Sequence, residues 1–488
     1  MDTTGVSIIS RRRVAYPGAD DFFSPSTKFP EYQFDHLSTK PNVVYEMVRE
    51  SLAQSGLDAE RFGTSRWNPL RELIVPGSSV FVLCNFVYHR RATETVSSFR
   101  GKCIHASVLR AILDYVLLAV GSYGTVAFGN APLQACRWGR VLNDTGSTAV
   151  LNFYNRMGCH VEAKDLRLKV IDLSFLGRTK GTQLRDEATE SVEVDLGATS
   201  LLSEVTADNR NSPRFRVSDY DPRRTEAFQS AEHHRYVVNR AVVDADAVIS
   251  LSKLKTHSKV GITCGLKGFV GAVGHKDCLA HYRLGGPSTG GDEYPGRSPV
   301  RYALSKLHDC VWGRDHGQLM QAALQILDRS ASRVLARGNS IGDGGWYGND
   351  TAWRMALDMA RIVRAVDKAG QMSETVQRTN ISFIDGIVGG EGEGPLSPKP
   401  VDSGVIVFSP DVAMGDRVAC RLMGFEPSAI PLIREAFRPM KYPVSERKPS
   451  ECVVNFNGRR VSEAEVAPVL SRPFLPPRGW SGYVEKQS

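Results

Sequence analysis

The sequence predicts an α/β protein with a mostly parallel, doubly wound sheet, helices on both faces, an irregular N-terminal arm and a polar insertion. Two observations lead to this prediction. Residues 79–87 (SVFVLCNFV) form a nearly continuous apolar run, which is typical of a strand covered on both faces of a parallel sheet. Runs of this kind alternate with segments of helical periodicity, and such alternation implies right-handed crossovers between parallel strands.

The first part of the chain follows this alternation after an irregular start. Residues 1–41 are rich in Pro, Ser and aromatic residues and are predicted to form the arm, and residues 42–176 a first α/β lobe. Apolar residues at helical spacing from Val43 to Leu52 indicate a helix that ends near Gly56. The further elements predicted in this lobe are strands at 79–87, 125–128 and 160–168 and helices at 105–120 and 147–157.

The second part of the chain begins with a change of pattern. Residues 177–232 are polar and lack regular periodicity, so they are predicted to be the insertion. Residues 233–437 are predicted to form a second α/β lobe, and residues 438–488 an irregular tail with one hairpin around Asn457-Gly458. The elements predicted in the second lobe are strands at 242–251, 380–388 and 404–408 and helices at 301–335 and 351–369.

The charge balance favours small anionic partners over macromolecules. The chain has 61 Lys and Arg against 53 Asp and Glu, a formal net charge of +8. This excess is small for 488 residues, and no long basic block is interleaved with aromatic residues, so nucleic-acid binding is disfavoured. The longest apolar stretch, residues 108–120, contains Arg110 and Asp114 and is shorter than the roughly 20 residues of a membrane span, so no span is predicted.

The cysteines indicate a reducing compartment. Their number is odd, 9, and no Cys-x-x-Cys pair occurs. This distribution argues against a disulfide framework, a zinc ribbon and an iron–sulfur cluster. We therefore expect a cytoplasmic protein.

A segment rich in Lys and His directly follows the strand predicted at 242–251. Because ligands of open parallel sheets bind beyond the carboxyl ends of the strands, this position favours a functional site. Glycines recur among the basic residues, as expected where the backbone approaches something closely. The alternative is a solvent-facing basic loop. The candidate catalytic residues are His257, Lys255 and Lys267, and Lys253 and His281 are candidate substrate-binding residues.

These residue types suit acid/base chemistry on an anion. Imidazole titrates near neutrality, and a lysine in an enclosed site can act as a base or a Schiff-base nucleophile because desolvation lowers its pKa. His257 and His281 are also candidate ligands of a divalent metal, although their spacing is not diagnostic of one. The sequence does not determine a cofactor.

Other predicted strand ends supply further candidates. Asn85 lies at the end of the strand at 79–87, Asn130 lies in a Gly-Asn-Ala-Pro turn, and Asp385 precedes a glycine-rich acidic loop at 389–395. Capping and turn formation are the alternative roles of such residues. We expect all three to contact substrate. The sequence contains no P-loop, Gly-x-Ser-x-Gly or His-Glu-x-x-His motif, which disfavours the corresponding enzyme classes.

Several of these motifs together resemble a known family. The chain is identified as a member of the uncharacterised domain-of-unknown-function 362 family over about residues 75–420. Three further blocks, at 67–70, 291–295 and 345–351, resemble a subgroup that accompanies surface-polysaccharide biosynthesis proteins. Some members carry ferredoxin-like iron–sulfur modules, which the absence of clustered cysteines excludes here. The motifs that carry the family resemblance are Asp246-Ala247-Val248-Ile249, Lys253-Leu254-Lys255-Thr256-His257, Gly265-Leu266-Lys267, His281, Ile384-Asp385-Gly386-Ile387 and Gly394-Pro395.

The chain departs from the family pattern twice. It has Leu83-Cys84-Asn85 where the family usually has Lys-Pro-Asn, and Lys267-Gly268 where the family usually has Lys-Asn. A more distant similarity links the order of Lys255, His257, Lys267 and His281 to the N-terminal domain of lactate racemase, in which Lys and His residues hold a nickel-pincer cofactor.

We therefore expect an acid/base enzyme of the isomerase or epimerase class. Its substrate would be a small anion such as a phosphorylated, nucleotide-linked or carboxylated sugar, in surface-polysaccharide biosynthesis. Lys255 and Lys267 would neutralise the anion, His257 would move the proton and Asn85 would orient the substrate. The alternative is a non-catalytic accessory protein that binds an anionic metabolite of such a pathway. The oligomeric state is not determined by the sequence.

Overall fold

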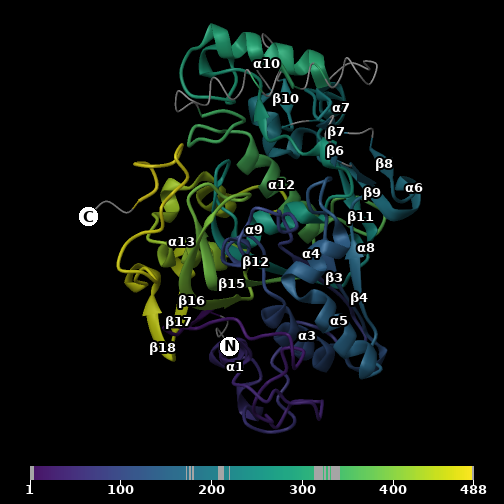
Figure 1. Ribbon diagram of the computed structural model, residues 1–488, viewed down its shortest axis with the longest axis vertical. Coiled ribbons are helices and arrows are strands. Elements are labelled where there is room, and N and C mark those ends of the chain that lie inside the picture. The colour runs from purple at the N-terminus through teal and green to yellow at the C-terminus, as the bar shows by residue number, and fades with distance from the viewer. Residues whose placement is uncertain are drawn as a thin grey trace.

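The computed structural model describes residues 5–171, 173–174, 177–178, 181–206, 214–218, 220–312, 323, 326–327, 330 and 341–485. Its centre is one large sheet, in the order β18-β17-β1-β16-β15-β12-β2-β3-β4, with β13 added beside β12 (Figure 1). The strands of this sheet are β1 (Val6–Ser10), β2 (Ser79–Cys84), β3 (Thr125–Asn130), β4 (Val161–Asp165), β12 (Ala247–His257), β13 (Gly261–Ile262), β15 (Thr379–Glu391), β16 (Lys399–Ser409), β17 (Val453–Phe456) and β18 (Arg459–Ser462).

The five neighbouring strands from β4 to β15 are all parallel, and β16 runs antiparallel to β15. The chain forms β2, β3 and β4 in order outward and then returns to place β12 on the other side of β2. The strand order therefore reverses between β2 and β12, which is where open α/β sheets bind their ligands. These pairings confirm the predicted α/β class with a largely parallel sheet.

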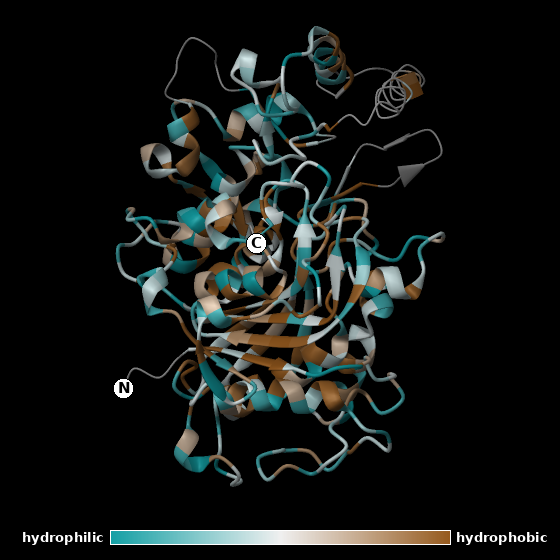
Figure 2. Cartoon of the chain, turned by 90° about the vertical axis from the view of Figure 1, so that its left-hand side faces the viewer, coloured by the Kyte–Doolittle hydropathy of each residue, from teal (hydrophilic) through white to brown (hydrophobic). Residues whose placement is uncertain are grey.

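Helices cover both faces of the sheet, as predicted. On one face α1 (Val43–Gln54), α3 (Ala106–Val120) and α5 (Ser147–Arg156) pack against one another and the strands, and on the other face α9 (Cys264–Gly268), α12 (Ala352–Ala365) and α13 (Val412–Leu422) do so. Each face has its own apolar core. Figure 2 shows the apolar strands as a brown layer between these helices. The remaining helices are α2 (Val96–Arg100), α4 (Trp138–Thr145), α6 (Glu187–Glu190), α7 (Pro222–Phe228), α8 (Arg240–Val243), α10 (Pro299–Trp312) and α14 (Pro431–Arg434).

Both ends of the chain join the sheet edge. Strand β1 of the predicted irregular arm pairs with β16 and β17, and the hairpin predicted around Asn457 is confirmed as β17 and β18. Strand β1 was not predicted, because five residues are too few to show a periodicity; its partner β16 determines its conformation.

Smaller sheets and irregular segments lie beyond the carboxyl ends of the parallel strands. Part of the predicted insertion is ordered: β9 pairs with β11, and β10 pairs with β14. The helix predicted at 301–335 is present as α10, and residues 313–335 lie largely outside the described residues. The short strands are β5 (Lys169–Val170), β6 (Leu173–Ser174), β7 (Gly177–Arg178), β8 (Thr182–Gln183), β9 (Ser191–Asp195), β10 (Phe215–Arg216), β11 (Arg235–Asn239) and β14 (Tyr282–Arg283).

Strands β12 and β15 both end later than the sequence pattern predicts, and both reach the site. The predicted start of the first strand at residue 242 is wrong: Arg240–Val243 form helix α8, and β12 begins at Ala247. Strand β12 continues six residues beyond Leu251 to His257, and β15 continues into the first residues of the predicted glycine-rich loop and ends at Glu391. Their extensions pair with each other, Lys253 beside Asp385 and Lys255 beside Gly390, with an irregularity between the two pairs. The basic segment is therefore partly a buried strand.

One segment of the described residues, Ala106–Tyr123, is long and apolar enough to cross a membrane by composition. It consists of α3 and the turn after it, and 72% of it is buried inside the protein. Its apolar residues are accounted for by the core beneath the sheet.

Candidate functional site

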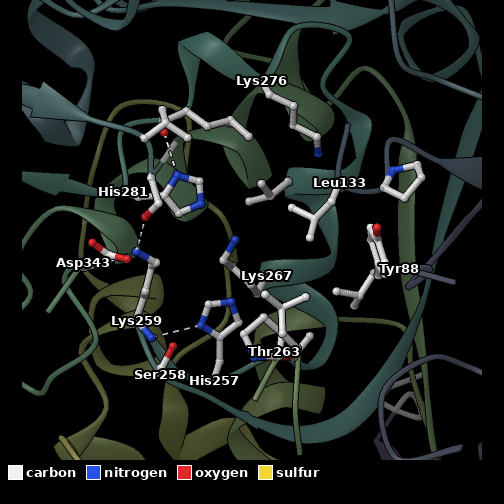
Figure 3. Close-up of a pocket in the computed structure, with 18 of the residues that line it drawn as sticks. Tyr88, Leu133, His257, Ser258, Lys259, Thr263, Lys267, Lys276, His281 and Asp343 are labelled. Carbon is white, nitrogen blue, oxygen red and sulfur yellow. Dashed lines mark hydrogen bonds between the residues drawn. The ribbon is translucent and has the colours of Figure 1, made fainter. Parts of the chain in front are cut away.

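A cavity of about 800 Å³ opens where the strand order reverses. Asn85 follows β2 in its wall, Asn130 ends β3, and His257 ends β12. Lys267 on α9 and His281 complete the set of predicted residues that line it. Figure 3 shows the amine of Lys267 between the two imidazoles, with Leu133 and Tyr88 across the view. The three side chains that follow β12 therefore share one hollow, and the alternative of a solvent-facing basic loop is wrong for His257 and Lys267, which are 6% and 9% exposed.

His257 presents a hydrogen-bond donor. The backbone N–H of Lys259 donates to its Nδ1 over 3.1 Å, so Nδ1 carries no proton. Burial, followed by the positive charges of Lys267 and Lys255, holds the pKa of His257 well below its usual value. The ring is therefore neutral near pH 7 with its proton on Nε2. A neutral imidazole of this kind polarises a substrate oxygen and does not accept a proton.

His281 has the opposite arrangement. Its Nδ1 lies 2.8 Å from the carbonyl oxygen of Leu279, which can only accept, so Nδ1 carries the proton. Burial and the charges of Lys259 and Lys267 hold the pKa of His281 well below its usual value. Its Nε2 is then an unprotonated base. The backbone thus assigns complementary roles to the two histidines of one cavity.

The amine of Lys267 has no hydrogen-bond partner among the described residues, although the side chain is nine-tenths buried. Burial, followed by the nearby charges of Lys276, Lys259 and Lys255, lowers its pKa to about 7. Near neutral pH this amine is therefore divided between the ammonium and the free base. It can hold an anion in the first form and act as a base or nucleophile in the second.

Lys255 acts through Asn85. It does not line the cavity; its amine donates to Oδ1 of Asn85 over 2.7 Å and to the backbone oxygen of Lys102. The contact to Oδ1 fixes the orientation of the amide, and Nδ2 of Asn85 has no acceptor among the described residues, so its N–H groups remain available to a ligand. Asn130 donates from Nδ2 to Phe86, while its buried Oδ1 has no partner among the described residues.

Comparison with known protein families gives a match that covers His257, Lys267 and His281 of the cavity. Residues 197–421 match a family described as a domain of unknown function (DUF362). This segment is a DUF362 domain. No curated protein and no solved structure matches the chain significantly. The family prediction is confirmed over the matched residues, and the predicted polysaccharide subgroup and lactate racemase similarity stay predictions.

The DUF362 domain supplies the basic half of the cavity, and the preceding residues supply much of the rest. His257, Lys267, Lys276 and His281 belong to the domain, whereas Asn85 and Asn130 precede it. Lys276 was not among the predicted site residues; its amine donates to the backbone oxygen of Ala131 over 2.6 Å. The signal available in the sequence was its position directly after Gly274-His275, within the segment rich in Lys, His and Gly.

Two residues of the DUF362 motifs lie away from the cavity. Lys253 and Asp385 are fully buried and form an ion pair of 3.0 Å. Tyr16, from the N-terminal arm, bonds both: its hydroxyl lies 2.6 Å from each partner. The backbone N–H of His105 also donates to Asp385. The polar atoms of Lys253 and Asp385 are therefore bonded to each other and to the arm, and they hold β12, β15 and the arm together. Neither residue lines the cavity.

The DUF362 helix that carries Lys267 is fixed at its start by a carboxylate from α13. Asp416 accepts the backbone N–H groups of Gly265 and Leu266 over 2.6 and 2.8 Å. Its side chain is fully buried, so this contact holds the first turn of α9 against α13. The sequence does not single out Asp416, because nothing in its local pattern distinguishes it from a surface residue of an amphipathic helix.

Gly268, one of the two departures from the DUF362 pattern, is required by packing. A Cβ built there would lie 2.5 and 2.6 Å from the hydroxyls of Ser252 and Ser250 on β12. We expect Gly268→Ala to lower the free energy of unfolding by about 1–3 kcal/mol through overpacking. Gly139→Ala is the control: a Cβ there meets nothing within 4 Å, and alanine in helix α4 should stabilise by about 0.5–1 kcal/mol. Equal urea midpoints for both variants would contradict this account of Gly268.

The described residues contain no cluster of three or more His, Cys, Asp or Glu side chains placed to hold a metal ion. His257 and His281 each direct Nε2 to the cavity, but only Nε2 of His281 carries a lone pair in the tautomers fixed above. Coordination by both rings would require the backbone contact at His257 to break.

Proposed function

We propose that the protein is an acid/base enzyme that moves a proton on a small anionic substrate. The observation that carries the proposal is the opposite protonation of two imidazoles in one cavity: Nε2 of His281 as base, and Nε2–H of His257 as donor to a substrate oxygen. Lys267 neutralises the anion, and Asn85, held by Lys255, orients it. This division of roles moves the proton acceptor from His257, expected from the sequence, to His281.

The lining supports an anionic substrate of moderate size. Its cationic side chains are Arg91, Lys259, Lys267, Lys276 and Arg478, against the carboxylates of Asp343 and Glu393. A volume of about 800 Å³ lies in the range of small-molecule sites and exceeds the need of a single phosphate ion. We infer a phosphorylated, nucleotide-linked or carboxylated sugar as the substrate class, isomerisation or epimerisation as the reaction, and surface-polysaccharide biosynthesis as the pathway. All nine cysteines are free thiols, which supports a cytoplasmic location.

The test is the uptake of solvent deuterium. The protein is incubated in D2O with a panel of sugar phosphates, nucleotide sugars and uronic acids, and each compound is analysed by mass spectrometry. An isomerase or epimerase that works through a carbon-bound proton should add one deuterium to its substrate. A compound that binds saturably and takes up no deuterium would favour the alternative, a binding protein for an anionic metabolite, and no binding to the whole panel would contradict both.

A further inference from the structure

Lys267 differs from the other lysines that surround it. Each of the others donates to oxygen atoms of the protein, and the partners are Asp385 and Tyr16 for Lys253, Asn85 and the Lys102 carbonyl for Lys255, Ser218 and the Asp343 carbonyl for Lys259, and the Ala131 carbonyl for Lys276. Among the described residues, the amine of Lys267 has no such partner and projects into the cavity (Figure 3). The amines of the other four lysines are therefore bonded within the protein, whereas the amine of Lys267 is available to a ligand.

The surroundings of Lys267 also favour the neutral amine. Lys276, Lys259, Lys255 and the two histidines are close enough to interact with it electrostatically, and no carboxylate in the described part of the chain is hydrogen-bonded to it. An amine that is removed from water and placed beside other cations loses its proton more readily. Its pKa of about 7 leaves a large unprotonated fraction at neutral pH. A surface lysine, with a pKa of about 10.4, has almost no unprotonated fraction at this pH.

We propose that Lys267 is a covalent nucleophile that forms an imine with a carbonyl-bearing anionic substrate. The structure supplies the three requirements of this chemistry in one cavity: an unpartnered buried amine, a base in Nε2 of His281, and an N–H donor in His257 that can polarise the carbonyl oxygen. The substrate class is an aldehyde or ketone that also carries a carboxylate or phosphate, which the remaining donors of Lys276 can bind.

The step balances without an additional reagent. The Lys267 nitrogen attacks the carbonyl carbon, the C–N bond forms, and the electron pair of the C=O bond moves to oxygen. Nε2 of His281 then carries the two protons of the nitrogen to that oxygen in succession, and the oxygen leaves as water when the C=N bond forms. Amine and carbonyl thus give imine and water. The imine draws electrons from the neighbouring carbon, so a proton on that carbon becomes easier for His281 to remove.

This inference deepens the proposed function and rests on it for the identity of the cavity as the substrate site. It replaces the neutralising role of Lys267 with a covalent one and gives the anion to Lys276. Reductive trapping tests it. The protein is incubated separately with glyoxylate, pyruvate and pyridoxal 5′-phosphate, borohydride is added to reduce any imine to a stable secondary amine, and the modified residue is located by peptide mass spectrometry. We expect a reduced adduct on Lys267 with at least one probe, and half-maximal labelling near pH 7.

Lys267→Arg and Lys40→Arg are the matched variants. Lys40 is an exposed surface lysine, so its replacement should leave labelling at Lys267 unchanged, whereas Lys267→Arg should remove the adduct formed near pH 7. If Lys267→Arg fails to fold, the mapped position and the pH dependence in the wild-type protein still decide. Labelling of Lys267 by no probe, or only at the alkaline pH and rate of Lys40, would overturn the inference.

The two proposals fail separately. Deuterium uptake without an adduct would leave the proton transfer standing and remove the imine. An adduct on Lys267 without deuterium uptake by any compound would leave the nucleophile standing and contradict the isomerase or epimerase.

Discussion

Replacing His281 with glutamine is expected to lower the rate of solvent deuterium uptake by about 10²–10⁴-fold, the usual contribution of a general base. Glutamine fills a similar volume but has no basic nitrogen, so it cannot accept the proton that Nε2 of His281 accepts. The reason for choosing His281 is the carbonyl of Leu279, which fixes the proton of the ring on Nδ1.

The same substitution at His257 is expected to cost much less. The side-chain amide of glutamine still donates a hydrogen bond, which is the role that the contact from the Lys259 N–H assigns to His257. We expect a loss of about tenfold, corresponding to one hydrogen bond of about 1–1.5 kcal/mol. If the two variants lose activity equally, or if His257→Gln is the worse of the two, the assignment of base and donor is wrong.

The pH dependence gives an independent check on His281. Burial and neighbouring lysines lower its pKa, so the ring is already neutral at pH 7 and stays neutral as the pH rises. Protonation of His281 should therefore lower deuterium uptake on the acid side, and this ring should cause no change at alkaline pH. Lys267, with a pKa of about 7, should add a second change near neutrality, and this change should be absent in Lys267→Arg.

The α/β class and the parallel strands could be predicted because their sequence signals are local. Alternating apolar runs and helical periodicities mark the parallel strands and their covering helices, and the reversal of strand order places the cavity beyond β2 and β12. The extension of β12 to His257 could not be predicted, since Lys253 and Lys255 interrupt the apolar run that marks a strand. Their conformation depends on pairing with β15, more than 100 residues away.

The division of roles within the site was also beyond the sequence. The tautomers of His257 and His281 depend on a backbone N–H and a backbone carbonyl, which no residue type reveals. The sequence likewise predicted one anion-neutralising role for Lys255 and Lys267, and substrate binding for Lys253. In the structure, Lys253 and Lys255 already have hydrogen-bond partners in Asp385 and Asn85. Lysines of one segment therefore differ in function, because some amines are already hydrogen-bonded within the described part of the protein and the amine of Lys267 is not.

The buried pair of Lys253 and Asp385 gives the largest expected effect on stability. Asp385→Ala should lower the free energy of unfolding by about 3–5 kcal/mol, because it leaves the ammonium of Lys253 buried at 0% exposure without its counter-charge. The hydroxyl of Tyr16 and the backbone N–H of His105 would lose an acceptor at the same time. Urea denaturation of the wild type and the variant measures the difference.

A double-mutant cycle separates this structural role from substrate binding. Lys253→Met combined with Asp385→Leu removes both charges, so the double variant should be more stable than the sum of the single losses predicts. Since neither residue lines the cavity, the folded fraction of each variant should retain deuterium uptake within a few-fold of the wild type. A variant of Asp385 with wild-type stability and no uptake would instead return Asp385 to the substrate-binding role that its sequence motif predicts.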